Sequence, residues 1–271
     1  MSASTKRVIT ATSIILFVGL GLFFLPMWAY AAIVILLIAG GLNEFYSLIE
    51  KKGIFIYKYF GVLIGILIPL SIYFKFEPTK GWELLFIVTA TLIFFILQFI
   101  RKDSSQAIVG ISTTLFGIFY VSWFFSFLIK IRFLPHGTLL VAFLLLVTKI
   151  GDVGAYIVGR SMGKNMLITR ISPKKTLEGS LGGLGFSLGA AIISKLYLPF
   201  IPLIHLVALG ILIGFLSQLG DLCESLIKRD CQVKDSGAHL PGLGGILDVI
   251  DSIIFASPIF YYYLLCFKLI P

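Results

Sequence analysis

Long apolar runs, separated by short polar stretches, dominate the chain. A helix that crosses a bilayer needs about 20 apolar residues. The runs that approach this length lie at roughly 8–25, 27–46, 54–74, 81–100, 108–129, 138–159, 178–197, 200–222 and 247–269. The pattern predicts an all-α integral membrane protein, a polytopic bundle of about nine transmembrane helices.

The first run has features of a secretory signal, because Lys6 and Arg7 precede it and Ala29-Tyr30-Ala31 follows it. Residues 8–25 are longer than the apolar region of most signal peptides, and a second run follows directly. We therefore interpret the first run as a retained membrane helix.

Composition supports a membrane location. The chain of 271 residues is 58% hydrophobic and 13% charged, whereas soluble domains carry about 25% charged residues. The net charge of +9 raises the question of nucleic-acid binding, but the basic residues lie between apolar runs, as expected of loops beside an anionic leaflet. We expect the protein to interact with a lipid bilayer and not with nucleic acid.

The three cysteines and three histidines show no metal-ligand spacing.

Lysine and arginine are unevenly divided between the two sides of the predicted bundle. One side carries fifteen: Lys6, Arg7, Lys51, Lys52, Lys58, Arg101, Lys102, Arg160, Lys164, Arg170, Lys174, Lys175, Lys228, Arg229 and Lys234. The other carries six: Lys75, Lys80, Lys130, Arg132, Lys195 and Lys268. The positive-inside rule then predicts a multi-pass protein of the cell (inner) membrane with a cytoplasmic N-terminus. The loops 160–177 and 223–246 would face the cytoplasm.

Acidic residues gather near the end of the chain. Six of the thirteen fall between Asp221 and Asp251. Asp221, Glu224 and Lys228 share one helical face, and Asp248 and Asp251 share another. The Gly- and Pro-rich segment 240–245 between them can fold the second helix back beside the first.

Four carboxylates in a site of low dielectric constant need cations to stay ionised. We predict that Asp221, Glu224, Asp248 and Asp251 hold Mg²⁺, with room for a second cation. The basic residues nearby would offset charge on phosphate oxygens, as phosphoryl or nucleotidyl transfer requires. An interfacial turn with unrelated ion pairs is the alternative interpretation.

A second polar cluster lies upstream. Lys149 and Asp152 fall near the cytoplasmic end of one predicted span, and Ser172, Lys174, Lys175 and Thr176 follow in the next loop. Residues 159–164 fail the Walker pattern, because the first glycine and the final Ser or Thr are missing. Hydroxyls and lysines at a helix start suit an anion, although an ordinary basic loop explains them too.

The segment 225–252, SLIKRDCQVKDSGAHLPGLGGILDVIDS, resembles the signature of the phosphatidate cytidylyltransferase (CDP-diglyceride synthase) family. That pattern is close to S-x-x-K-R-x(4)-K-D-x-x-x-x-x-P-G-H-G-G-x-x-D-R-x-D. Similarity extends over about 148–255. Leu243 stands where the family usually has His, and Val249 where it has Arg. Either the family tolerates these changes, or this member has altered substrate contacts or reduced activity.

The resemblance implies that CTP and phosphatidic acid give CDP-diacylglycerol and pyrophosphate, in phospholipid biosynthesis. It implies catalytic roles for Lys228, Arg229, Lys234 and Asp235. Substrate binding would fall to the upstream cluster: Lys149, Asp152, Ser172, Lys174, Lys175 and Thr176. We expect residues 138–271 to form the catalytic transmembrane region and 1–137 to form a scaffold of about five helices; a homodimer is left open.

Three other functions remain as alternatives. A cation-coupled transporter would have acidic residues near mid-span and repeats between its halves. A sugar-phosphate transferase would use a nucleotide-sugar donor and a lipid phosphate. A structural protein would give no reason for a basic loop facing an acidic one.

Overall fold

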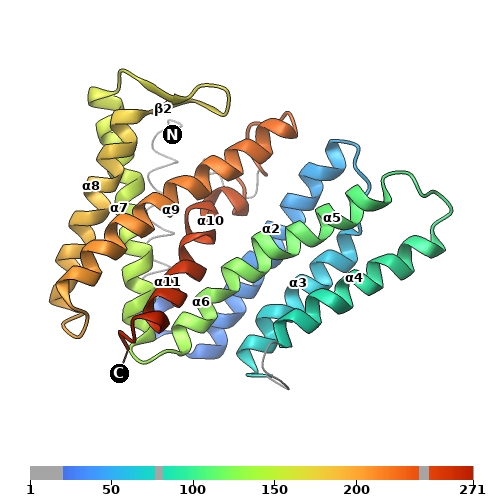
Figure 1. The fold of residues 1–271 in the computed structure, drawn as a ribbon, viewed down its shortest axis with the longest axis horizontal. Helices are drawn as coiled ribbons and strands as arrows, with labels where there is room; N and C mark the ends of the chain where they lie inside the picture. The colour runs from blue at the N-terminus through green and yellow to red at the C-terminus, as the bar shows by residue number, and fades with distance from the viewer. Residues whose placement is uncertain (1–20, 77–81, 238–243, 271) are drawn as a thin grey trace.

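A computed structural model describes residues 21–76, 82–237 and 244–270 (Figure 1). The described part is mostly helical, as predicted. The helices of the N-terminal half are α2 (Met27–Lys51), α3 (Lys58–Tyr73), α4 (Trp82–Ile100), α5 (Ala107–Gly117), η1 (Ile118–Trp123) and α6 (Phe124–Phe133). The C-terminal half contains α7 (Gly137–Met162), β1 (Met166–Ile168), β2 (Ser172–Thr176), α8 (Leu177–Ile193), η2 (Ser194–Leu196), α9 (Leu203–Asp230), α10 (Ile246–Ile254) and α11 (Ala256–Cys266).

Six helical stretches of the described chain are long and apolar enough to cross a membrane: 27–51, 107–133, 137–162, 177–196, 203–230 and 246–266. Two shorter apolar helices, 58–73 and 85–100, coincide with predicted spans. The predicted span 8–25 lies largely outside the described residues. The predicted multi-pass membrane protein is therefore confirmed, whereas the count of about nine spans is not.

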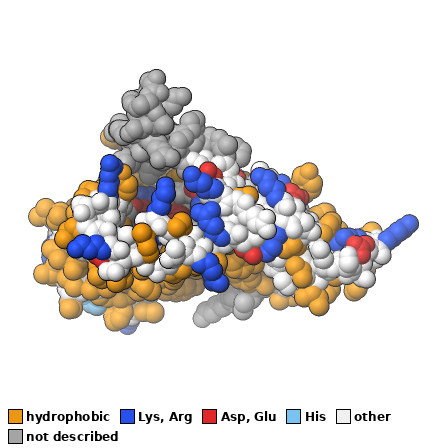
Figure 2. Space-filling view, turned by 90° about the horizontal axis from the view of Figure 1, so that it is seen from above, with side chains coloured by type: hydrophobic (Ala, Val, Ile, Leu, Met, Phe, Trp, Pro, Cys, Tyr) orange, Lys and Arg blue, Asp and Glu red, His pale blue; other side chains and the backbone are white. Residues whose placement is uncertain are grey.

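The outer surface of the bundle is apolar, as lipid contact requires. Large side chains on several helices are strongly exposed, including Tyr59 (87%), Phe99 (82%) and Leu196 (85%). Figure 2 looks down on the end of the bundle where the strands and the end of α9 lie, and it shows Lys and Arg side chains across that face above an apolar flank. Charge and apolar surface are thus separated along the helix axes.

Small residues allow α7, α8 and α9 to pack closely. A Cβ at Gly154 of α7 would meet the Phe186 ring of α8, and one at Gly214 of α9 would meet the Ser187 side chain. The Ser187 hydroxyl also donates a hydrogen bond to the Val147 carbonyl oxygen of α7 (3.0 Å). These contacts fix the three helices that surround the upstream polar cluster.

The predicted loop 160–177 contains more structure than the sequence pattern indicated. Strands β1 and β2 form an antiparallel hairpin in which Met166 pairs with Thr176 and Ile168 with Ser172. The Glu178 carboxylate accepts hydrogen bonds from the backbone N–H groups of Lys164 (3.1 Å) and Asn165 (3.2 Å). The hairpin is therefore fastened to the first turn of α8.

The two halves of the chain share an interface. Helix α10 packs against both α2 and α9 (Figure 1), and Lys52 at the end of α2 forms an ion pair with Asp230 at the end of α9 (2.5 Å). The predicted boundary at residues 137 and 138 falls at the start of α7, directly after the turn that follows α6. The assignment of separate scaffold and catalytic roles to the two regions stays a prediction.

Candidate active site

Three carboxylates from α9 and α10 converge near the ends of these helices. Ligand oxygens of Asp221, Glu224 and Asp251 all lie within 4.8 Å of one another. Gly220 makes this approach feasible, because a Cβ there would meet the Asp251 carbonyl oxygen. Glu224 is fully buried and Asp251 is nearly so. The predicted convergence of two acidic helical faces is therefore confirmed for these three residues.

Lys228 joins the two acidic faces. Its ammonium group forms ion pairs with Glu224, one turn earlier on α9, and with Asp248 Oδ1 on α10 (2.5 Å). The lysine and Asp248 side chains are each 12% exposed, and the Glu224 side chain is fully buried. Such pairs lose much of their hydration, so they hold only while every charge keeps a partner. Lys228 thereby fixes the relative positions of α9 and α10.

Asp248 differs from the other three acids in its surroundings. Its Oδ2 accepts hydrogen bonds from the Ser236 hydroxyl (2.7 Å), the Ser236 N–H (3.1 Å) and the Gly245 N–H (2.7 Å). Asp248 thus caps the start of α10 by accepting a hydrogen bond from the backbone N–H of the N-cap residue Gly245. It lies outside the group of three, both of its oxygens have partners, and its assignment as a metal ligand stays a prediction.

Lys149 extends the cluster to α7. Its Nζ donates hydrogen bonds to the Ser252 hydroxyl (2.9 Å) and the Val249 carbonyl oxygen (3.3 Å), and it pairs with Asp152 (3.4 Å). The Ser217 hydroxyl of α9 donates to the other Asp152 oxygen (3.4 Å). The two predicted residues of α7 therefore lie beside the acidic group.

An open cleft of about 420 Å³ lies between α7, α8, α9 and the hairpin. Its charged and polar lining residues are Asp152, Tyr156, Arg160, Lys174, Lys175, Thr176, Ser180, Gln218 and Asp221. Lys175 forms an ion pair with Asp221 across the cleft (2.5 Å), and both side chains are partly exposed. The cleft therefore reaches from the basic hairpin to one carboxylate of the group.

Thr176 and Ser172 have different positions in this cleft region. Thr176 is the N-cap of α8, where its hydroxyl accepts a hydrogen bond from the Gly179 N–H (3.1 Å), and it is almost buried. Ser172 begins β2 and is absent from the residues that line the cleft. Their predicted substrate contacts stay predictions.

The remaining predicted catalytic residues lie on the surface. Arg229 donates from Nε to the Ile171 carbonyl oxygen (3.1 Å), so it attaches the hairpin to α9, and a second bond reaches the Val233 carbonyl oxygen (3.2 Å). Lys234 and Asp235 are exposed in the segment after α9. None of the three lines the cleft, and their catalytic roles stay predictions.

The cluster has the chemistry of a divalent-cation site. Counted as fully charged, the five carboxylates of Asp152, Asp221, Glu224, Asp248 and Asp251 exceed the three ammonium groups of Lys149, Lys175 and Lys228 by two charges. Among the described residues, the buried Glu224 oxygens accept no hydrogen bond of ordinary geometry. Carboxylate oxygens are ligands that Mg²⁺ prefers. Asp221, Glu224 and Asp251 therefore fit a divalent cation.

Sequence reasoning missed two residues of the N-terminal half. Glu44 of α2 accepts hydrogen bonds from the start of α10. Tyr120 lies in the π-helical segment η1, is 2% exposed, and lies near Asp251 and Glu224. Its hydroxyl has no hydrogen-bond partner among the described residues. An acidic residue within an apolar run often has a functional role, so the sequence contained a signal for Glu44. It contained no such signal for Tyr120.

Comparison with known proteins gives a consistent result. Residues 5–267 match the model of the cytidylyltransferase family. The chain is 34% identical to a phosphatidate cytidylyltransferase of Synechocystis sp. in an alignment that covers 96% of each chain. It is 43% identical to a phosphatidate cytidylyltransferase of Bacillus subtilis over 152 residues, or 55% of this chain and 56% of that one. A chloroplastic phosphatidate cytidylyltransferase of Arabidopsis thaliana is 31% identical over 94% of this chain and 70% of its own length.

Proposed function

The chain belongs to the cytidylyltransferase family, and we propose that it is a membrane enzyme that converts CTP and phosphatidic acid to CDP-diacylglycerol and pyrophosphate. The observation that carries the proposal is the meeting of Asp221, Glu224 and Asp251 beside a cleft lined by Lys174 and Lys175. Such a site combines hard oxygen ligands with cations that attract phosphate.

In this reaction a phosphate oxygen of the lipid attacks the α-phosphorus of CTP. A phosphorus–oxygen bond forms, the bond between the α- and β-phosphates breaks, and pyrophosphate leaves. The attacking phosphate is already ionised, so no protein nucleophile is needed. Catalysis would therefore depend on positioning and on stabilisation of charge.

Asp221, Glu224 and Asp251 would hold Mg²⁺, with room for a second cation. A bound divalent cation would supply charge screening of the triphosphate. Lys175 pairs with Asp221 at the cleft, so an incoming phosphate would compete with that carboxylate for the lysine. Arg160 and Lys174, which are exposed at the cleft, would attract the anionic substrates.

We further propose that this end of the bundle faces the cytoplasm, where CTP is available. The basic face in Figure 2 agrees with the positive-inside rule. Apolar flanks would keep the acyl chains of substrate and product in the leaflet. A homodimer stays a prediction, which the mass of the detergent-solubilised protein would test.

Purified protein in mixed micelles should form a lipid-soluble product from labelled CTP and phosphatidic acid, and chelation of divalent cations should abolish it. Asp251→Asn should lower kcat by at least about 100-fold, since even residues that only support a metal ligand contribute 10–100-fold. A Lys102→Met variant, altered on the exposed surface between α4 and α5, is the matched control. Normal turnover by Asp251→Asn, or transfer from a nucleotide sugar but not from CTP, would refute the proposal.

A further inference from the structure

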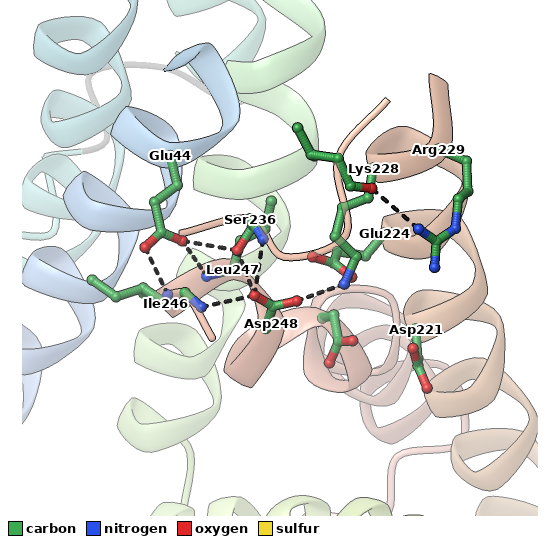
Figure 3. A network of polar contacts seen from close by, with 12 residues as sticks. Glu44, Asp221, Glu224, Lys228, Arg229, Ser236, Ile246, Leu247 and Asp248 are labelled. Carbon is green, nitrogen blue, oxygen red and sulfur yellow. Dashed lines mark hydrogen bonds and ion pairs between the residues drawn. The ribbon is translucent and has the colours of Figure 1, made fainter. Parts of the chain in front are cut away.

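A buried acid of the N-terminal half lies against the start of the helix that carries Asp251. Glu44 of α2 is 2% exposed. Its Oε1 accepts a hydrogen bond from the Ile246 N–H (2.9 Å), and its Oε2 accepts one from the Leu247 N–H (2.9 Å). These N–H groups belong to the first turn of α10, where helix amides have no partner within the helix. Glu44 therefore caps α10 from a different helix (Figure 3).

The packing around Glu44 leaves little freedom. A Cβ at Gly245 would meet both Glu44 Oε2 and the Ser236 hydroxyl, and a Cβ at Gly40 of α2 would meet the Ile246 side chain. The missing side chains let α2 and the start of α10 approach closely. The carboxylate is thus held in one position against the helix end.

The same junction is connected to the acidic site. The Ser236 hydroxyl is within hydrogen-bond distance of Glu44 Oε2 (3.2 Å) and of Asp248 Oδ2 (2.7 Å). Asp248 in turn pairs with Lys228, whose ammonium group also holds Glu224. Figure 3 shows this continuous path from α2 through α10 to α9. A shift of α10 at Glu44 would be transmitted to Asp248 and, one turn further, to Asp251.

We propose that Glu44 is a positioning residue that sets the placement of α10 and thereby the separation of Asp251 from Asp221 and Glu224. The divalent-cation affinity of the site would then depend on a side chain that is not itself a ligand. This inference rests on the proposed metal site. It also assigns the N-terminal half a role in the chemistry beyond that of a scaffold.

Glu44→Gln is the sharpest perturbation, because it keeps the size of the side chain. The amide replaces one acceptor oxygen with an NH2 donor, so in the same position one of the two backbone N–H groups would face a donor and lose its acceptor. Supporting residues of metal sites contribute about 10–100-fold to affinity, and we expect Mn²⁺ to bind at least about 10-fold more weakly. Glu44→Asp keeps both oxygens but is one methylene shorter, so the Mn²⁺ affinity of this variant should lie between those of the wild type and Glu44→Gln. If Glu44→Gln does not fold, Glu44→Asp is used for the test.

The measurement is a Mn²⁺ titration of the detergent-solubilised full chain, followed by electron paramagnetic resonance of the free ion. Two controls lie on the same helix. Glu50→Gln removes an exposed partner of Lys58. Tyr46→Phe removes a buried hydrogen bond to the Thr114 carbonyl oxygen (2.8 Å), so it should lower the unfolding temperature. Both controls should keep the wild-type Mn²⁺ affinity.

Unchanged Mn²⁺ affinity in a folded Glu44 variant would overturn the inference, as would loss of affinity in Tyr46→Phe, which would indicate a general effect of stability. Absence of Mn²⁺ binding in the wild-type protein would overturn it as well. Cytidylyl transfer, measured on the same preparations, reports separately on the proposed function. Weaker binding in the Glu44 variants of a protein without that activity would support the positioning role and refute the proposed reaction.

Discussion

Replacement of Lys228 by methionine tests whether this lysine mainly supports the structure or mainly contacts substrate. The ammonium group lies between Glu224, which is fully buried, and Asp248, which is 12% exposed. Methionine keeps the apolar length of the side chain and removes the charge. It would leave two carboxylates, one of them fully buried, without their shared counter-ion.

Removal of one partner from a buried ion pair costs about 3–5 kcal/mol. For a chain of this size, each 1 kcal/mol lowers the unfolding temperature by about 2–4 °C, so we expect a decrease of about 6–20 °C. Replacement of both partners of a buried pair by hydrophobic residues of similar volume is often nearly neutral. The double variant Lys228→Met with Glu224→Met should therefore recover more than half of the loss.

Size-exclusion chromatography of samples heated in detergent measures the unfolding temperature. Lys102→Met, a change at an exposed lysine, is the matched control and should have the unfolding temperature of the wild type. Divalent cations should stabilise Lys228→Met more than the wild type, because they can replace the lost charge. An unfolding temperature of Lys228→Met within about 2 °C of wild type would refute the structural role, and a large loss of kcat in that stable protein would instead favour substrate contact.

Three further changes test the site. Lys175→Ala removes a partly exposed ion pair with Asp221, so it should change the free energy of unfolding by less than about 1 kcal/mol. It should raise the KM for CTP about 10-fold, equivalent to about 1.4 kcal/mol. An unchanged KM would exclude a contact between Lys175 and a phosphate of CTP. Gly220→Ala places a Cβ against the Asp251 carbonyl oxygen. It should destabilise the protein by about 1–3 kcal/mol and weaken Mn²⁺ binding. Wild-type stability together with wild-type Mn²⁺ affinity would show that α9 and α10 need not approach so closely. Tyr120→Phe removes a buried hydroxyl without a partner among the described residues, so the unfolding temperature should stay the same or rise, and a clear decrease would reveal a bound water or lipid at this position.

The sequence by itself determined which segments are helical and apolar. Observed α7 (137–162) and α8 (177–193) begin within a residue of the predicted runs, because an apolar run bounded by polar residues is a local property. The helical face of Asp221 and Glu224 was predictable from their spacing for the same reason. The convergence with Asp251 also followed, because a Gly- and Pro-rich segment between two helices can fold the second back beside the first.

Tertiary structure alone decided how the polar residues are paired. Asp248 resembles Asp251 in the sequence pattern, yet it caps α10, while Asp251 joins Asp221 and Glu224 in the group that could hold a metal ion. Glu44 accepts a hydrogen bond from the first residue of α10, 202 residues later in the chain. A pattern of apolar positions holds no information on such a partner. Which acid receives a backbone N–H, a lysine or a cation depends on distances of a few ångströms between packed helices. The packing of the helices fixes those distances, whereas the spacing of apolar residues along the sequence does not.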